Sequence, residues 1–307
     1  MNFYPALALT FLFVFISIRI FNILWLYFFQ KPKNLRKEAG ASWAVVTGAT
    51  DGIGQAYAFE LAARGFNVFL VSRTQSKLDQ TKAEILQKHP NILVKTAQFD
   101  FKTSSSEDYK ELLKILNQVE IGMLVNNVGV FYDVPNELHH VGVDYLADMV
   151  MVDTLPPTLL TAGILPQMLL RNQGIIVNIG STAGCLHLPL MAAYSASKKY
   201  VEWLTDTLRM EYKNTDLIFQ NIVPLMVATK MAGIREPSFF VPDATTFAKS
   251  ALDTIGYANQ TTGYITHQLQ FEVIRFVPGM LIDWAVTKRN EASRERILEK
   301  RRRQKRE

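Results

Sequence analysis

Cysteine is almost absent from this chain of 307 residues, since Cys185 is the only one. An internal disulfide is therefore excluded, which fits a reducing compartment. The sequence also has no group of histidines, cysteines and carboxylates at the spacing typical of a metal site. His139 and His140 are adjacent, so on a helix they point in different directions, and no cysteine or carboxylate joins them at ligand spacing. Disorder is excluded by the hydrophobic fraction of 49%, and we find no internal repeat or low-complexity segment.

Charge is scarce at the N-terminus, where Arg19 is the only charged residue between Tyr4 and Phe29. A bilayer is spanned by roughly 20 apolar residues, so this run is long enough. A charge near the membrane centre costs about 2.5–3.5 kcal/mol on insertion scales. The run therefore spans at a tilt or lies partly in the interface, and we predict that residues 1–30 form a membrane anchor.

A cleaved signal peptide is the alternative reading of this run. It needs an apolar core of roughly 7–15 residues and a small-residue cleavage site. Here the core is too long and ends in the bulky Trp25, Tyr27, Phe28 and Phe29, so we favour a retained anchor over a soluble enzyme. Basic residues follow at once in a predicted linker, 31–41, and the positive-inside rule places the rest of the chain in the cytosol.

The formal net charge of +5 is concentrated at the C-terminus, in Lys300–Arg303 and in Lys305 and Arg306. These residues form either a solvated tail or a patch attracted to an anionic membrane surface. Lys305, third from the end, also resembles part of a basic endoplasmic-reticulum retrieval signal. No nucleic-acid recognition motif accompanies the tail, so we expect no nucleic-acid partner.

Short apolar runs alternate with segments of helical spacing after residue 41. The runs read as strands at 44–46, 68–71, 92–99, 122–125, 174–179, 217–223 and 263–266. Such alternation predicts parallel βαβ units with helices on both faces of the sheet. We therefore expect an α/β fold, a Rossmann-type doubly wound parallel sheet of about seven strands, over residues 42–270.

Residues 271–307 combine an apolar segment with the basic tail. The apolar part, 271–286, is interrupted by Pro278 and Gly279 and is too broken for a clear membrane span. Association with a membrane interface is a hypothesis for this segment.

A glycine-rich loop lies between the first predicted strand and the first predicted helix. Glycines there permit a tight turn and close approach of the backbone to a pyrophosphate, and the helix N-terminus supplies N–H groups and a favourable dipole. The loop predicts a dinucleotide site rather than a plain turn, with the candidate residues Thr47, Gly48, Asp51, Gly52, Ile53 and Gly54.

The second predicted strand ends at Ser72 and Arg73. A site selective for NAD usually carries an acidic residue there, which binds the ribose 2′-hydroxyl. A guanidinium instead suits a 2′-phosphate, so Arg73 favours NADPH and NADP+ as the cofactor pair. Asp100, after the third strand, either holds the adenine amino group or caps a helix.

Tyr194 and Lys198 are four residues apart, so on a helix they share one face. The ordinary pKa of tyrosine is about 10, and a nearby ammonium lowers it toward the range that suits proton exchange. Ser181 lies thirteen residues before Tyr194, just after a predicted strand. We expect the serine hydroxyl to lie beside the phenol.

From about Ser42 to Thr266 the chain resembles the short-chain dehydrogenases/reductases. The matching motifs are the glycine loop, Asn126-Asn127-Val128-Gly129, Ser181, Tyr194 and Lys198. The apolar N-terminus and the amino-acid sequence of the glycine loop resemble one branch of that family. This branch holds the membrane-bound 17β-hydroxysteroid dehydrogenases and the very-long-chain 3-oxoacyl-CoA reductases.

The resemblance implies an oxidoreductase that uses NADPH to reduce a ketone on a lipid-like substrate, either a steroid or a long-chain 3-oxoacyl-CoA, at the endoplasmic-reticulum membrane. Tyr194 would donate the proton, and Ser181 would bind the carbonyl oxygen of the substrate. Lys198 would lower the tyrosine pKa and hold the nicotinamide ribose, and Asn127 would support the cofactor. Dimers and tetramers are common in the family, so a homo-oligomer is also implied.

One departure concerns the catalytic set itself. The family has an asparagine on the helix after the Asn-Asn-x-Gly motif, and its backbone carbonyl organises a water leading to the lysine. Asp153 stands at that place here and adds a negative charge, which must find a partner or a proton if it is buried. A second hypothesis is therefore a cofactor-binding sensor or scaffold with weak catalysis or none.

Overall fold

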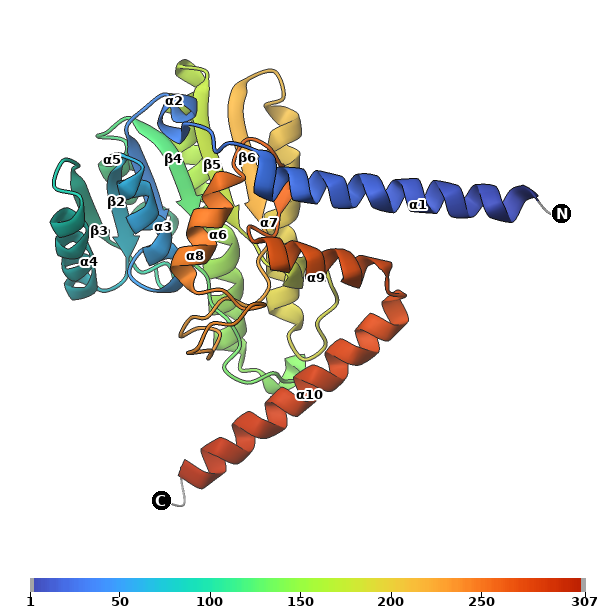
Figure 1. Ribbon diagram of the computed structural model, residues 1–307. Helices are drawn as coiled ribbons and strands as arrows, with labels where there is room; N and C mark the ends of the chain where they lie inside the picture. The colour runs from blue at the N-terminus through green and yellow to red at the C-terminus, as the bar shows by residue number, and fades with distance from the viewer. Residues whose placement is uncertain (1–2, 305–307) are drawn as a thin grey trace.

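The centre of the computed structural model is a sheet of seven parallel strands in the order β3-β2-β1-β4-β5-β6-β7 (Figure 1). The structure describes residues 3–304, apart from the side chains of residues 3–6, 8, 9 and 12. The strand order reverses beside β1 and β4, which is where doubly wound sheets bind ligands at their carboxyl edge. The predicted fold class is confirmed. The strands are β1 (Trp43–Thr47), β2 (Asn67–Ser72), β3 (Val94–Gln98), β4 (Ile121–Asn126), β5 (Gln173–Ile179), β6 (Asp216–Ile222) and β7 (Gln260–Thr261).

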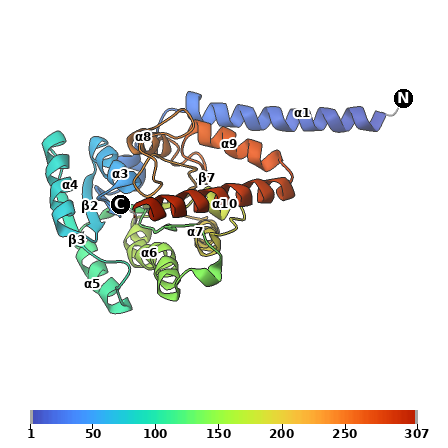
Figure 2. The ribbon, with the colours of Figure 1, turned by 90° about the horizontal axis from the view of Figure 1, so that it is seen from below.

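Helices cover both faces of this sheet (Figure 2). Two buried apolar clusters result, one on each face. Because the central strands β1 and β4 are buried along their whole length, they read in the sequence as unbroken apolar runs. The helices of the first cluster are α3 (Gly52–Ala63), α4 (Gln75–Lys88) and α8 (Ala244–Asp253), and those of the second are α5 (Ser106–Leu116), α6 (Val143–Leu170) and α7 (Ala192–Glu211).

The predicted linker 31–41 contains a short helix, α2 (Leu35–Ala39), whose first and last residues are buried in the first cluster. The side chain of Asn34 caps this helix by accepting a hydrogen bond from the Lys37 N–H at 3.2 Å. The segment is thus part of the folded core as well as a connection.

The prediction of a last strand at 263–266 is wrong. Strand β7 is only two residues long, and helix α9 (Ile265–Phe276) begins where the strand was expected. Gly263 lies between them at φ 75°, a left-handed conformation that turns the chain out of the sheet and that favours glycine.

The apolar N-terminus forms a helix, α1 (Phe3–Leu24), which continues into a π-helical segment, η1 (Trp25–Phe29), and projects from the body (Figures 1 and 2). Arg19 makes a bidentate ion pair with the buried Glu272 of α9, with two N–O distances of 2.9 Å. The hydroxyl of Tyr27 lies 2.7 Å from that of Thr261. The charge inside the apolar run therefore has a counter-charge on the α/β domain.

Within the described residues, one helix is long and apolar enough to cross a bilayer, and it is α6, half of which is buried in the fold. Its packing in the second core cluster identifies α6 as a core helix. The apolar helical stretch 13–29 is shorter and is consistent with the predicted anchor.

The C-terminal residues form α9 and a long helix, α10 (Gly279–Gln304), which runs beneath the body (Figures 1 and 2). Asn290 of α10 is buried and donates to the Pro189 carbonyl at 2.8 Å, and Arg294 lies 3.0 Å from Glu137. The tail residues Lys300–Arg303 belong to this helix, whereas Lys305 and Arg306 lie outside the described residues. Helix α10 thus touches the loops that follow β4 and β5.

Candidate active site

The glycine-rich loop between β1 and α3 is tied to the end of β4 by a set of hydrogen bonds. The Thr47 hydroxyl accepts from the backbone N–H groups of Asn127 and Val128, at 2.9 and 3.1 Å. The Asn127 amide donates in return to the Thr47 carbonyl at 2.9 Å. Asp51 caps α3 by accepting from the Gly52 N–H at 2.9 Å. The loop is therefore held at the switch point of the sheet.

Glycine is required at three positions of this loop. Gly48 and Gly52 have φ of 65° and 54°, the left-handed region in which other residues are strained. A Cβ on Gly54 would lie 2.3 Å from the Asn127 amide nitrogen and 2.4 Å from the Gly48 carbonyl oxygen. Ile53, between the last two, packs against the first core cluster. The loop thus brings bare backbone and a helix N-terminus together, as a pyrophosphate requires.

Arg73 follows β2 at the same edge and is exposed. Among the described residues its guanidinium has no hydrogen-bond or ion-pair partner, although its carbonyl accepts from Gln98. Asp100 accepts from the Lys102 N–H at 3.1 Å in the turn after β3, and helix α5 is capped by Ser105. The helix-cap reading of Asp100 is therefore wrong, and an adenine contact stays a prediction for it.

The three residues expected to perform the chemistry come together at the end of β5 and the start of α7. Tyr194 and Lys198 share one face of α7, and the lysine nitrogen lies 5.5 Å from the centre of the tyrosine ring. The Ser181 side chain lies near enough to the phenol to lower its pKa, and its hydroxyl accepts from the Ala183 N–H at 3.1 Å. Ser195 donates to the carbonyls of Ala183 and Leu186, at 2.8 and 3.0 Å, which fastens the serine loop to α7.

Asp153 of α6 lies directly behind this set and is buried, with 1% of its surface exposed. Its carboxylate accepts from the Val130 N–H at 2.9 Å and from the Ser197 hydroxyl at 2.8 Å. A Cβ built on Gly129 would lie 2.9 Å from the Asp153 oxygen and 3.2 Å from the Lys198 nitrogen, so the two charged groups converge on one point. The buried Asp153 carboxylate is therefore hydrogen-bonded and lies near the positive charge of Lys198.

The sequence pattern did not identify Ser197 as a partner of Asp153. A signal was present, because Ser197 directly precedes Lys198 on the helix that carries the tyrosine. Nothing in the sequence marked Val130, since its contribution is a backbone N–H group.

Opposing effects set the charge states of the buried pair. Burial alone would lower the pKa of Lys198, but the negative charges of Asp153 and of the ionised Tyr194 outweigh burial and raise it. Burial raises the pKa of Asp153 above its ordinary value, although the ammonium and the two hydrogen bonds oppose this rise. Lys198 is therefore a stable ammonium at neutral pH.

The expected lowering of the tyrosine pKa is only part of the balance. Burial of the phenol raises the pKa of Tyr194, and the negative charge of Asp153 raises it further. The positive charge of Lys198 and the Ser181 side chain lower the pKa. The net result is a pKa above the ordinary value of tyrosine. Lys198 thus lowers the tyrosine pKa as predicted, but burial outweighs that effect. The site keeps Tyr194 as a neutral phenol that is ready to give up a proton.

An apolar wall stands next to the phenol. The ring of Phe131 meets that of Tyr194 edge-on, with 4.8 Å between centroids. Behind it lies a small buried cluster of Tyr132, Met149 and Met191. These residues were not predicted, although Met149 is four residues before Asp153 and so shares its helix face.

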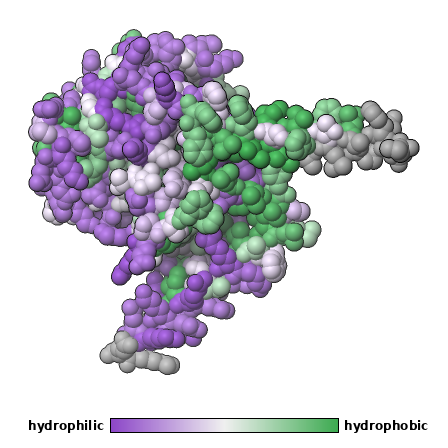
Figure 3. Space-filling model, viewed as in Figure 1, coloured by the Kyte–Doolittle hydropathy of each residue, from purple (hydrophilic) through white to green (hydrophobic). Residues whose placement is uncertain are grey.

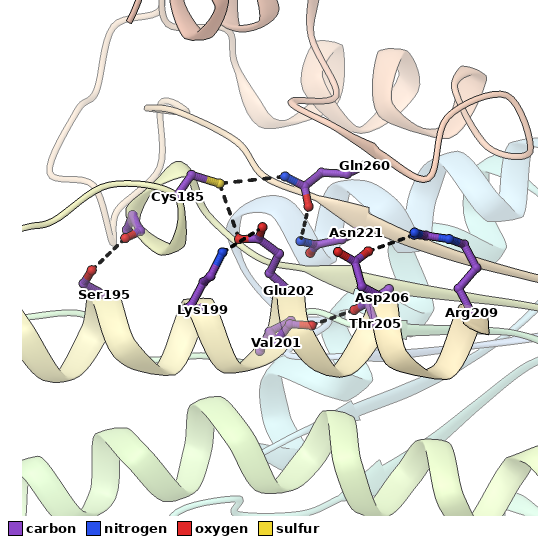
Figure 4. Close-up of polar contacts among 11 residues, drawn as sticks. Cys185, Ser195, Lys199, Val201, Glu202, Thr205, Asp206, Arg209, Asn221 and Gln260 are labelled. Atoms are coloured by element: carbon purple, nitrogen blue, oxygen red, sulfur yellow. Dashed lines mark hydrogen bonds and ion pairs between the residues drawn. The ribbon is translucent and has the colours of Figure 1, made fainter. Parts of the chain in front are cut away.

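Cys185 has polar neighbours of its own, Glu202 and Gln260 (Figure 4). Its sulfur faces the Glu202 carboxylate at 3.5 Å and the Gln260 amide at 3.8 Å. Burial first, and then the Glu202 charge, raises the pKa of the thiol to about 12. A reactive thiolate is therefore excluded at neutral pH. His187 is exposed, 3.5 Å from Asp283 of α10.

A glycine cradle at the switch point, with a serine, a tyrosine and a lysine beside it, defines an oxidoreductase site of the short-chain dehydrogenase kind. The chain belongs to the short-chain dehydrogenase family, whose model matches residues 42–237. The expected family and enzyme class are confirmed.

Individual relatives are similar over nearly the whole chain. A Caenorhabditis briggsae protein named very-long-chain 3-oxoacyl-CoA reductase is 57% identical over 92% of this chain and 90% of its own length. A Caenorhabditis elegans protein that carries a steroid dehydrogenase name is 57% identical over 96% of this chain and 94% of its own. A solved Sphingobium yanoikuyae short-chain dehydrogenase in complex with NADPH is 27% identical, with a TM-score of 0.62 over 69% of this chain and 83% of its own.

Proposed function

We propose that this chain reduces the ketone of a lipid-like substrate with NADPH, at the endoplasmic-reticulum membrane. The observation that carries the proposal is the position of Tyr194 and Lys198 on one face of α7, with the lysine nitrogen 5.5 Å from the centre of the phenol ring and Ser181 beside the phenol. A protonated acid at neutral pH suits reduction, which consumes a proton, better than it suits oxidation.

The cofactor is held by residues that fit it. The glycine loop would hold the pyrophosphate at the N-terminus of α3, and Arg73, whose guanidinium has no partner within residues 3–304 as described, would hold the 2′-phosphate. Asn127 braces the loop from the end of β4. The NADPH complex of the Sphingobium relative supports this choice of cofactor.

When bound, NADPH supplies the hydride that adds to the carbonyl carbon. Tyr194 donates its phenolic proton to the carbonyl oxygen, while the Ser181 hydroxyl holds that oxygen in place. Lys198 stabilises the phenolate that is left and binds the nicotinamide ribose. The Ile179 carbonyl accepts from the Lys198 ammonium at 3.5 Å, and the negative charge of Asp153 stabilises that ammonium.

A long-chain 3-oxoacyl-CoA is the first substrate to test, and a steroid ketone is the second. The names of the two worm relatives support both substrates. The apolar wall of Phe131, Tyr132, Met149 and Met191 beside the phenol suits an acyl chain or a steroid ring. The apolar helix α1 would keep the enzyme where such substrates dissolve, with the catalytic domain in the cytosol.

The sensor or scaffold hypothesis rests on Asp153 in place of the usual asparagine. The carboxylate has two hydrogen bonds, so an unpartnered charge gives this hypothesis no support, and a comparison of Asp153→Asn with the unchanged chain tests it.

The test is NADPH oxidation by the detergent-solubilised full chain, supplied with 3-oxoacyl-CoA thioesters of several lengths and with steroid ketones. Tyr194→Phe keeps the ring and removes the acidic proton, and it should lose nearly all turnover. Turnover of neither substrate class, or equal turnover by Tyr194→Phe, would defeat the proposal.

A further inference from the structure

Exposed apolar side chains gather where α9 ends and α10 begins (Figure 3). Six residues of this turn, here called the α9–α10 corner, have exposed fractions between 37% and 83%: Val273, Phe276, Val277, Met280, Leu281 and Trp284. Soluble surfaces seldom gather so many large apolar side chains in one place, and such a patch marks an interaction site.

The corner lies on the side of the body toward which α1 projects. Figures 1 and 2 both show α9 beside the base of α1 and the corner reaching out in the direction of that helix. The Arg19–Glu272 ion pair and the contact of Tyr27 with Thr261 fix α1 against this part of the domain. A surface that surrounds α1 therefore also meets the corner.

We propose that the α9–α10 corner inserts into the same lipid surface as α1 and forms a second membrane contact, an inference that rests on the membrane association proposed above. The apolar surface of the corner is continuous with that of α1 (Figure 3), whose Phe11, Phe13 and Phe21 are equally exposed. Trp284 is of the kind that prefers the lipid interface, and Arg275, Lys288 and Arg289 lie exposed around the corner, where lipid headgroups would be.

The second membrane contact has a consequence for the active site, because α10 runs from the corner to the loops that follow β4 and β5. Asn290 holds Pro189, in the loop between Ser181 and Tyr194. Arg294 holds Glu137, in the loop after β4. A corner seated in lipid therefore fixes the position of α10, and of the loops that α10 contacts, relative to the membrane from which a lipid-like substrate comes.

Spin labels can place the corner directly. The full chain, with Cys185→Ala, carries one label at Met280→Cys in nanodiscs of phosphatidylcholine and phosphatidylserine. Phe13→Cys in α1 and Arg296→Cys, farther along α10, serve as references. We expect the label at 280 to collide often with dissolved oxygen and rarely with an aqueous nickel chelate. The label at 13 should behave in the same way, and the label at 296 should show the opposite pattern.

The other outcomes separate the two proposals. A label that is in lipid at 13 but in water at 280 overturns the second contact and leaves the anchor standing. Labels in water at both sites overturn the membrane association itself. A label at 280 that neither reagent reaches, with dipolar broadening between copies, shows that a second chain covers the corner and overturns the lipid contact.

Activity gives an independent readout. The triple variant Met280→Ser, Leu281→Ser and Trp284→Ser should lose several-fold in kcat/KM for a long-chain 3-oxoacyl-CoA supplied in vesicles, and should keep its kcat/KM for a short, water-soluble thioester. Leu93→Ser, at an equally exposed leucine elsewhere on the domain, is the matched control. Equal losses for both substrates, or a loss for neither, would overturn the coupling of the corner to substrate entry.

Discussion

Replacement of Asp153 by asparagine removes one buried charge and little else. The amide has nearly the shape of the carboxylate and can still accept from the Val130 N–H group. The negative charge of Asp153 raises the pKa of both Tyr194 and Lys198, in addition to the effects of their burial. Both pKa values should therefore fall in Asp153→Asn.

The size of the effect follows from the short separation of these groups. Two unit charges roughly 6–7 Å apart interact by about 2–3 kcal/mol at an effective dielectric constant of about 20. Such an energy changes a proton equilibrium by about fiftyfold. The reductive reaction needs a protonated tyrosine and a charged lysine, so the alkaline limb of its pH profile should move to lower pH. Near neutral pH, where both groups keep their protons, kcat should change by no more than a few-fold.

The assay is kcat/KM for NADPH-dependent reduction between about pH 6 and 11, with Asp148→Asn as the matched control. Asp148 lies on the same helix, but its partner is Lys102 at the surface, 2.7 Å away, so this change should leave the limb in place. If the alkaline limb of the pH profile stays in place or moves to higher pH in Asp153→Asn, the reasoning is refuted. A sharp gain in kcat at neutral pH would instead show that the aspartate disables the enzyme.

Three further predictions concern the cradle, the cofactor and acid stability. Gly54→Ala should cost about 1–3 kcal/mol of unfolding free energy in chemical denaturation and abolish NADPH binding, whereas Gly142→Ala, where a Cβ meets nothing within 4 Å, should do neither. Arg73→Ala should raise KM for NADPH by roughly ten- to a hundredfold and leave KM for NADH unchanged, because a charge-assisted bond is lost; equal changes would contradict the assignment. Burial lowers the pKa of His267 from 6.5 to about 4, so the unfolded chain takes up the proton first and about 3 kcal/mol of stability should be lost as pH falls between these values. His267→Gln should show a flatter pH dependence of Tm.

The features that the sequence predicted well depend on local patterns. Parallel strands buried on both faces must be apolar throughout, so β1, β2 and β4 stood out as short continuous runs. The spacing of Tyr194 and Lys198 on one helix is equally local, and it placed them correctly on one face of α7.

The features that it missed depend on residues far apart in the chain. Arg19 and Glu272 are separated by 253 positions, so nothing near either residue announces the ion pair. Strand β7 has two residues, too few for any periodicity to appear. The sign of the net effect on the Tyr194 pKa depends on burial and on a carboxylate from another helix, Asp153, which only the folded chain brings near.

The ion pair between Arg19 and Glu272 links the apolar helix α1 to the folding of α9. Until α9 is in place, the guanidinium within the apolar run lacks the Glu272 carboxylate, and an unpaired ion in apolar surroundings is costly. Seating of the first helix and closure of the last part of the domain are therefore cooperative: a lesion that loosens α9 also weakens the hold of the N-terminal helix, although the two are at opposite ends of the polypeptide.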